Sequence, residues 1–195
     1  MLKIKSPFNE SDIRKLVIGD KVLISGRIIT GRDAVHKYLH DGNISPIDLT
    51  DQIIYHVGPV IIKDESSGEY KITAAGPTTS IREEPYEWEL IKKYHLKGVI
   101  GKGGMGEKTL KACSDYGCVY FHAIGGAAQV LAEKVVKVVG VHLMELGSPE
   151  AMWELDVVDF PVVVTMDSHG NSLHDKILKQ SEKKLKELLY GEDNG

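Results

Sequence analysis

The sequence predicts an α/β fold, with a single layered domain built on a mixed sheet across residues 1–195. Short apolar runs rich in Val and Ile, which are typical of strands, dominate the first half of the chain. From Pro85 onward, segments typical of strands alternate with segments typical of helices. No internal repeat, low-complexity segment or linker-like stretch divides the chain, and its length is ordinary for one domain.

The first half is expected to contain strands separated by turns and two helices. A short helix is predicted at 11–15, and a second one at 31–39, where apolar side chains recur at helical spacing. Asp41-Gly42-Asn43 breaks the second helix. The predicted strands of this half are 21–30, 53–57, 60–63 and 70–75.

The second half is expected to follow a strand–helix alternation. The predicted helices are 87–95, 107–116, 127–136 and 173–189, the last being long and amphipathic with a solvated, Lys-rich face. The predicted strands are 98–100, 118–123 and 161–166. The tail 192–195 is expected to be frayed.

Composition limits the class of protein. Hydrophobic residues make up 42% and charged residues 27% of the chain, as in soluble globular proteins. A net charge of -4 argues against a general nucleic-acid binder, and no apolar run approaches a membrane span. Residues 1–8 lack the apolar core of a secretory signal, so we expect a cytoplasmic location.

The two cysteines do not predict a metal site in this chain. Cys113 and Cys118 are spaced unlike a zinc knuckle, and two thiols cannot supply the three or four thiolates that an iron–sulfur cluster needs. We expect both to be buried, reduced thiols. Any metal cluster must then come from another chain.

Three hydroxyls and a guanidinium lie close together in Thr78-Thr79-Ser80-Ile81-Arg82, at a junction between a strand and a helix. Unpaired backbone N–H groups and the helix dipole favour anions there. Thr78 and Arg82 are about one helical turn apart, so we expect them to share a face. This pattern suits proton transfer on a small organic acid, and the alternative is a helix cap beside a solvated arginine.

The loop Gly101-Lys102-Gly103-Gly104-Met105-Gly106 formally matches a dinucleotide-binding fingerprint. The next predicted strand, however, does not end in the acidic residue that would hold a ribose, and the loop does not match a P-loop either. The glycines let a backbone approach a ligand closely. Lys102 sits among them at a helix start, where a bound carboxylate would relieve its unfavourable position.

Arg32 also starts a predicted helix, where an anion would again be favourable. His36, one turn later, is expected on the helix surface, and the alternative is that it orients Arg32. The other histidines show no metal-ligand spacing and are expected in strands or at the surface. Asp156 and Asp159 are expected to cap rather than to catalyse.

Together, these motifs resemble the β subunit of class I fumarate hydratases and of the related L-tartrate dehydratases. The resemblance rests on three ordered motifs and continues nearly to the end of the chain: Thr30–His36, Gly76–Arg82, Gly101–Gly106, Phe121–Gly126 and Val157–Asp167. It implies a swivelling β/β/α domain and a reversible hydration of fumarate to L-malate. It also implies an α subunit that carries a [4Fe–4S] cluster on three cysteines, in an α2β2 assembly.

The resemblance further implies roles for four residues. Thr78 matches the threonine that exchanges the C3 proton of the substrate, and Arg82 matches an arginine that binds a substrate carboxylate. Arg32 and Lys102 match the other cationic ligands of the dicarboxylate. Ser80-Ile81 departs from the small residues common in relatives, which bears on the substrate rather than on the reaction.

The implied chemistry is coherent, because a cluster iron can act as a Lewis acid and fixed cations can stabilise the charge that proton abstraction creates. A threonine hydroxyl is a poor base, so an activating group is needed, which we expect from the α chain. Three alternatives stay open at this stage: a tartrate rather than a fumarate enzyme, a nucleotide-dependent enzyme, and a non-catalytic binding module.

Overall fold

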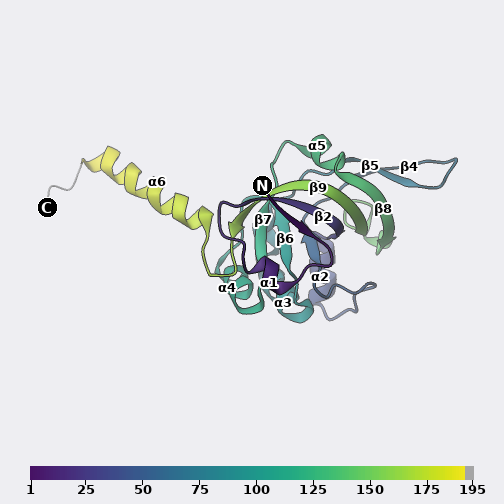
Figure 1. Ribbon diagram of the computed structural model, residues 1–195, viewed down its shortest axis with the longest axis horizontal. Coiled ribbons are helices and arrows are strands. Elements are labelled where there is room, and N and C mark those ends of the chain that lie inside the picture. The colour runs from purple at the N-terminus through teal and green to yellow at the C-terminus, as the bar shows by residue number, and fades with distance from the viewer. Residues whose placement is uncertain (192–195) are drawn as a thin grey trace.

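The computed structural model describes residues 1–191 and shows the predicted α/β fold (Figure 1). The strands are β1 (Leu2–Lys5), β2 (Lys21–Thr30), β3 (Ile53–Tyr55), β4 (Val60–Lys63), β5 (Tyr70–Ala74), β6 (Gly98–Gly101), β7 (Val119–His122), β8 (Val135–His142) and β9 (Met152–Met166). The helices are α1 (Glu10–Ile13), α2 (Asp33–His40), α3 (Glu84–Tyr94), α4 (Glu107–Tyr116), α5 (Ala128–Ala132) and α6 (Leu173–Tyr190), with the 3₁₀ turns η1 (Ser80–Glu83) and η2 (Met144–Leu146).

Seven strands form one mixed sheet in the order β1-β2-β3-β6-β7-β9-β8, which confirms the predicted mixed sheet. The pairs from β1 to β7 are parallel, whereas β9 runs antiparallel to β2, β7 and β8. Because β9 pairs with both β2 and β7, the circuit β2-β3-β6-β7-β9 closes on itself. The strands β4 and β5 form a separate antiparallel hairpin.

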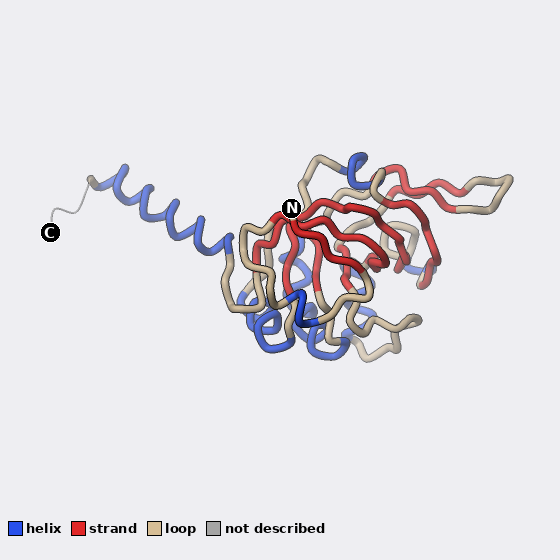
Figure 2. Tube along the Cα trace, viewed as in Figure 1, coloured by secondary structure: helices blue, strands red, loops and turns tan. Residues whose placement is uncertain are grey.

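Both faces of the sheet are covered, which explains why β3 and β6 are buried on both sides (Figure 2). The helices α2, α3 and α4 cover one face through apolar side chains that include Val35, Leu39, Leu90, Ile91 and Cys113. The opposite face closes around a second core with α5, centred on Tyr55, Phe121, Trp153 and Phe160. This layering places the ends of β3 and β6 beside the starts of α2 and η1.

The predicted helix at 127–136 is wrong in its second half. It ends at Ala132, and Val135 begins β8, which pairs with β9 as far as His142. The run of valines in 135–141 has strong strand propensity. Because β9 offers an edge for pairing, the residues from Val135 onward form a strand and do not continue the helix α5.

The strand predicted at 161–166 is only the end of β9, which begins at Met152. A bulge at Val158–Asp159, where Asp159 has a φ of 49°, shifts the register with β2 and precedes Pro161. The expected capping roles of Asp156 and Asp159 are also wrong. Both lie in β9 and form ion pairs, Asp156 with Arg27 at 2.6 Å and Asp159 with Lys3 at 3.2 Å.

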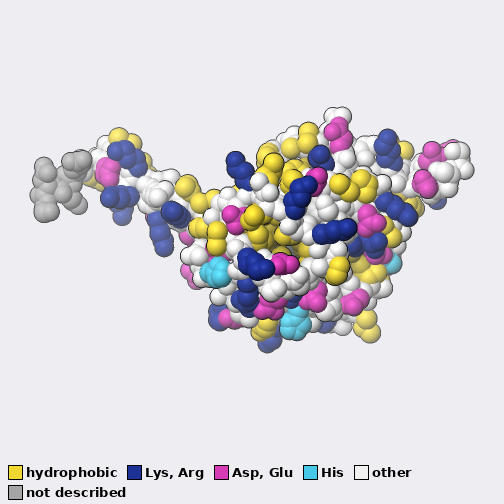
Figure 3. Space-filling view, in the orientation of Figure 1, with side chains coloured by type: hydrophobic (Ala, Val, Ile, Leu, Met, Phe, Trp, Pro, Cys, Tyr) yellow, Lys and Arg dark blue, Asp and Glu magenta, His cyan; other side chains and the backbone are white. Residues whose placement is uncertain are grey.

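The helix α6 projects from the body of the domain (Figures 1 and 3). None of its residues is buried, in agreement with the predicted solvated face. Ser172 caps its start by accepting a hydrogen bond from the Asp175 N–H at 3.2 Å. The predicted frayed tail at 192–195 lies outside the described residues.

Candidate active site

Backbone hydrogen bonds hold the Thr78 loop between the ends of β3 and β6. The Thr78 N–H donates to the carbonyl of His56 at 2.8 Å, just after β3. On the other side, the Lys102 N–H donates to the Thr78 carbonyl at 3.2 Å, and the Ser80 N–H donates to the Lys102 carbonyl at 3.0 Å. The loop that carries Thr78 and the loop that carries Lys102 are therefore fixed side by side.

The side chains of Thr78, Arg82 and Arg32 meet around one carboxylate. Arg82 Nη2 donates to Thr78 Oγ1 at 2.9 Å and to Asp33 Oδ2 at 2.8 Å. Arg32 Nε lies 3.4 Å from the same Asp33 oxygen and 2.8 Å from Glu150 Oε1. The expectation that Thr78 and Arg82 face each other is confirmed.

The alternative interpretation of this loop, in which its hydroxyls cap the following helix, is not supported. Thr79 is the residue at the start of η1, yet its side chain makes no capping hydrogen bond to that turn. The Thr78 hydroxyl is engaged by Arg82 instead. Thr78 and Thr79 thus have different surroundings, although they are adjacent in the sequence.

Lys102 is close to this cluster through its backbone and keeps an open side chain. The β-bridge between Thr79 and Lys102 fixes its position. Its Cδ lies 3.6 Å from the point that a Cβ on Gly125 would occupy, so this glycine leaves room beside the lysine. Within residues 1–191, no carboxylate oxygen comes within 4.0 Å of its Nζ.

Three residues that complete the cluster were missed by sequence reasoning. Asp33 and Glu150 balance the charge of the two arginines, and Glu150 Oε2 also accepts the Ala34 N–H at 3.0 Å. A Cβ on Gly58 would lie 2.6 Å from Arg32 Nη1 and 3.0 Å from the Pro149 carbonyl, so a larger residue would displace this guanidinium from its present position. Asp33, beside Arg32, carried a local signal, whereas the other two come from distant segments.

The glycine-rich loop does not offer its helix terminus to a phosphate, because the carboxylate of Glu84 occupies that place. Glu84 Oε2 accepts from the Gly106 N–H at 2.8 Å and from Thr109 Oγ1 at 2.6 Å. Its Oε1 accepts from the N–H groups of Lys108 and Thr109 at 3.0 and 3.2 Å. An anion of the chain itself therefore satisfies the start of α4, which argues against the nucleotide alternative.

A buried polar network lies behind the cluster and corrects the placement of His36. This side chain was expected on the helix surface, but it is fully buried between α2 and α3. Glu87 Oε2 accepts from His36 Nε2 at 2.7 Å and from His56 Nε2 at 2.9 Å. The spacing of the histidines in the sequence gave no sign of this grouping, because tertiary packing brings His36, His56 and Glu87 within 4.8 Å of one another.

Glu83 is a buried carboxyl group beside this network. It is 0% exposed, and neither of its side-chain oxygens has a hydrogen-bond partner within residues 1–191. Its Oε2 lies 4.0 Å from His36 Nδ1. Burial raises the pKa of Glu83 from 4.5 to about 7, although the charge of His36 opposes this shift.

The raised pKa of Glu83 predicts a pH-dependent stability. The folded chain binds this proton more tightly than the unfolded chain, so stability falls as pH rises from about 4.5 through 7. We expect Glu83→Gln to remove this slope, and its stability relative to wild type to grow by about 1–3 kcal/mol between pH 5 and 8. Urea unfolding of both proteins across this range checks it, and parallel stability curves would contradict it.

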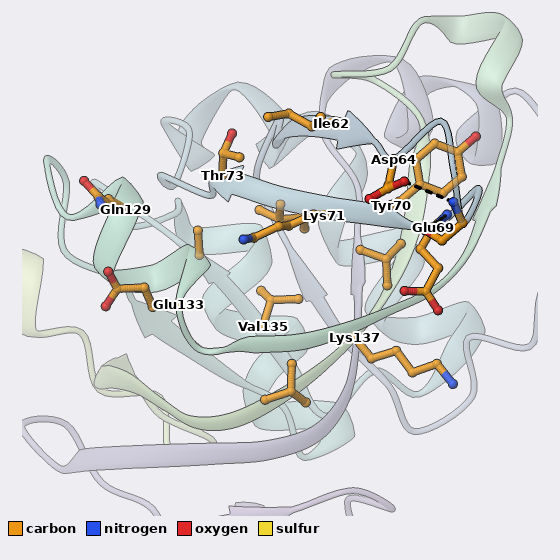
Figure 4. Close-up of a pocket in the computed structure, with 15 residues that line it drawn as sticks. Ile62, Asp64, Glu69, Tyr70, Lys71, Thr73, Gln129, Glu133, Val135 and Lys137 are labelled. Carbon is orange, nitrogen blue, oxygen red and sulfur yellow. Dashed lines mark hydrogen bonds between the residues drawn. The ribbon is translucent and has the colours of Figure 1, made fainter.

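A hollow lies elsewhere, between the hairpin β4–β5 and the segment formed by α5 and β8 (Figure 4). It measures about 790 Å³, and none of Arg32, Thr78, Arg82 and Lys102 lines it. Aliphatic side chains alternate there with charged ones such as Lys71 and Glu133. This hollow is therefore separate from the candidate site.

The cysteines occupy the positions expected of them. Cys113 and Cys118 are fully buried, unbridged thiols. Burial raises the pKa of Cys118 well above its usual value, so the group stays protonated. These two thiols do not fit an iron–sulfur cluster. Separately, no helix within residues 1–191 is long and apolar enough to cross a bilayer.

Fold and site together define an α/β domain in which two guanidinium groups share the Asp33 carboxylate, one of them also contacts a threonine hydroxyl, and the backbone of Lys102 is bonded to the same loop. Guanidinium groups are suited to carboxylate ligands. The family model described as Fumarase C-terminus matches residues 1–177, and the chain belongs to this family.

Relatives fall into two groups by length. A protein of Geobacillus stearothermophilus, provisionally named fumarate hydratase class I, is 56% identical over 188 residues, or 96% of this chain and 36% of the relative. The chain thus spans about a third of that relative. A protein of Methanocaldococcus jannaschii, provisionally named L(+)-tartrate dehydratase subunit beta, is 43% identical and covers 92% of this chain and 94% of its own length. The L(+)-tartrate dehydratase subunit beta of Escherichia coli is 34% identical, and the match covers 87% of this chain and 85% of that protein.

Proposed function

We propose that this chain is the β subunit of a two-chain hydro-lyase that reversibly hydrates fumarate to L-malate. The observation that carries the proposal is the contact of Arg82 with Thr78 Oγ1 inside a cluster of carboxylate-binding cations. The identity with a relative named as a fumarate hydratase class I supports fumarate as the substrate. We place the enzyme in the cytoplasm.

Arg32, Arg82 and Lys102 bind the dicarboxylate in this proposal. A guanidinium grips a carboxylate with two parallel N–H groups, and an ammonium makes a point contact. Asp33 and Glu150 hold Arg32 in place, while Lys102 has no carboxylate partner within residues 1–191. A substrate carboxylate therefore shares or replaces the Asp33 contacts and supplies a counter-charge to Lys102.

Thr78 holds the proton that moves to or from C3 of the substrate. In the dehydration direction, a base that we expect from the α chain takes the hydroxyl proton of Thr78, and Oγ1 can then take the C3 proton. In the hydration direction, the hydroxyl returns a proton to the carbon, and the α-chain group reprotonates Oγ1. Arg82 Nη2 donates to this oxygen at 2.9 Å, so its positive charge stabilises the alkoxide form. Proton abstraction places negative charge on the adjacent carboxylate, and the same cations stabilise it.

The [4Fe–4S] cluster belongs to a separate α subunit, and we propose an α2β2 assembly. The support from this chain is its two fully buried cysteines, which leave no thiolate set for a cluster. The relatives named as beta subunits have nearly the length of this chain. Their names imply a partner subunit.

L(+)-tartrate dehydration is the second candidate, because the two relatives that match this chain over most of their length carry that name. Tartrate and malate are both four-carbon dicarboxylates, so the same cations serve either. The exposed side chain of Ile81, next to Arg82, is the position in this loop where the substrates could be told apart.

The chain is expected to fold alone without binding iron in stoichiometric amount or hydrating fumarate. Activity is expected only after reconstitution with the α chain under anaerobic conditions. Iron analysis, circular dichroism and assays with fumarate, malate and L(+)-tartrate check this. Incorporation of four irons into the purified single chain would contradict the proposal, and turnover of tartrate alone would select the second candidate.

A further inference from the structure

We infer that the buried side chains His36, Glu87 and His56 act as a positioning unit that sets the placement of Arg32 relative to the Thr78–Arg82 loop. This inference rests on the proposed function, since it concerns the spacing of the proposed substrate-binding cations. None of the three side chains belongs to the cation cluster itself.

The three side chains come from three separate parts of the fold. His36 lies in α2, His56 follows β3, and Glu87 lies in α3, and all three are 0% exposed. The two imidazole rings meet edge to face, with centroids 4.9 Å apart and an interplanar angle of 83°. One oxygen, Glu87 Oε2, accepts from both rings at 2.7 and 2.9 Å. The carboxylate therefore joins α3 to α2, which begins beside Arg32, and to the segment after β3, which is bonded to Thr78.

The outer ends of this network reach the site directly. His36 Nδ1 donates to the carbonyl of Arg32 at 3.0 Å. His56 Nδ1 lies 2.9 Å from Ser80 Oγ, which also accepts from the Tyr120 hydroxyl at 2.8 Å. The His56 carbonyl accepts the Thr78 N–H. One continuous path thus runs from the backbone of Arg32 to the loop of Thr78, Ser80 and Arg82.

The partners fix where the protons lie. The Arg32 carbonyl can only accept, so His36 Nδ1 carries a hydrogen, and a carboxylate at Glu87 requires a second one on Nε2. His36 is then a cation. Tyr120 donates to Ser80, and Ser80 donates to His56 Nδ1, so His56 is neutral and donates through Nε2. Each hydrogen bond along the path therefore has one donor and one acceptor, and these assignments agree with one another.

The electrostatics agree with this arrangement. Burial opposes the charge of His36, but Glu87 outweighs it and raises the pKa of His36 above its usual value. Burial likewise opposes the charge of Glu87, and the two histidines lower its pKa nevertheless. A buried ion pair of this kind adds little stability compared with apolar packing, whereas in some proteins it selects one geometry, which is the role that we infer here. Its value here lies in orientation, because binding groups must be held within about 0.5 Å of their working positions.

A metal site is the competing interpretation of the same side chains, since their ligand atoms are within 4.8 Å of one another. Both Nε2 atoms, however, point to the same Glu87 oxygen at hydrogen-bond distances. They donate to this oxygen instead of directing lone pairs at a shared point. We therefore favour hydrogen bonding, and metal content is measured in the test.

The test compares Glu87→Gln with Glu154→Gln in the reconstituted two-chain enzyme. Glu154 is a matched control, because its carboxylate also contacts a histidine and an arginine, His142 Nε2 at 2.9 Å and Arg27 Nη1 at 2.8 Å, away from the cluster. We expect Glu87→Gln to raise KM at least about tenfold in the folded complex, and Glu154→Gln to leave KM unchanged. Unchanged KM in Glu87→Gln, with only a lower melting temperature, would overturn the inference.

A second measurement, on the chain alone, does not depend on the reaction. The N–H groups of Thr78, Ser80 and Lys102 form the backbone bonds that hold the two loops together. We expect Glu87→Gln to speed their hydrogen exchange at least tenfold, and Glu154→Gln to leave it unchanged. Ser80→Ala removes one link of the path, keeps the ion pair and should give a smaller increase, which provides a variant that folds if Glu87→Gln does not.

The outcomes separate the inference from the proposed function. Faster backbone hydrogen exchange in Glu87→Gln, together with a wild-type complex that has no hydro-lyase activity, would support the positioning role and reject the proposed function. Activity with unchanged exchange and unchanged KM in the variants would support the function and reject positioning. Stoichiometric zinc or iron in the purified chain, lost in His36→Gln, would overturn positioning in favour of a metal site.

Discussion

Replacing Thr78 with alanine is expected to lower kcat of the reconstituted enzyme by about 10²–10⁴-fold, the usual contribution of a general acid–base group. Thr78 Oγ1 is the only oxygen of its side chain, and Arg82 donates to it at 2.9 Å. The variant loses the atom that holds the C3 proton, but Arg32, Arg82 and Lys102 remain to bind the dicarboxylate. We therefore expect KM to change much less than kcat, as steady-state kinetics can show.

Thr79→Ala is the matched control for this prediction. Its side chain makes no capping hydrogen bond, and its Cγ2 lies 3.9 Å from the position of a Cβ on Gly103, on the side of the glycine-rich loop. A much smaller loss of kcat is expected. Equal losses in both variants would mean that the hydroxyls support the loop and do not move protons. Exchange of solvent deuterium into C3 of malate at the wild-type rate in Thr78→Ala would exclude Thr78 as the base.

Arg32→Met and Lys102→Met are each expected to weaken substrate affinity about 10- to 150-fold. This range corresponds to the loss of one charge-assisted hydrogen bond, about 1.5–3 kcal/mol. Methionine keeps much of the side-chain volume and removes the charge. The effect should fall mainly on KM, because these cations bind the substrate and do not hold the proton.

Arg27→Met is the control for the arginine. Arg27 resembles Arg32 in having two carboxylate partners, Glu154 at 2.8 Å and Asp156 at 2.6 Å, but it lies in the middle of β2, away from the Asp33 cluster. Its replacement should leave KM unchanged. Wild-type KM in both Arg32→Met and Lys102→Met would show that these cations do not touch the dicarboxylate.

Local patterns were sufficient to predict most elements of the fold. The strand 21–30 and the helix 107–116 have the predicted bounds, because periodicity and turn residues define them without help from distant contacts. The second half of the helix predicted at 127–136 was wrong, since pairing with the edge of β9 decides where β8 begins. The length of β9 was missed for a similar reason: its bulge at Asp159 is stabilised by pairing with β2.

In the candidate site, too, some features follow from local sequence and others depend on contacts between distant segments. Thr78 and Arg82 face each other as predicted, as their hydrogen bond shows, but Thr78 lies before the turn η1 and not within one helical turn of Arg82. The charge partners of the arginines could not be predicted with the same means. Glu150 lies more than a hundred residues from Arg32 along the chain, and only the approach of the segment before β9 to the start of α2 brings them together.

The sequence by itself determined the α/β class, the membership in a family and the four candidate site residues, because these depend on local spacing and on motifs in a fixed order. The tertiary structure alone decided that Glu84 fills the helix start of the glycine-rich loop and that His36 is buried against Glu87. Both are contacts between helices that the sequence keeps apart. A carboxylate or an imidazole has the same local pattern whether it meets water or a buried partner, and packing determines which one it meets.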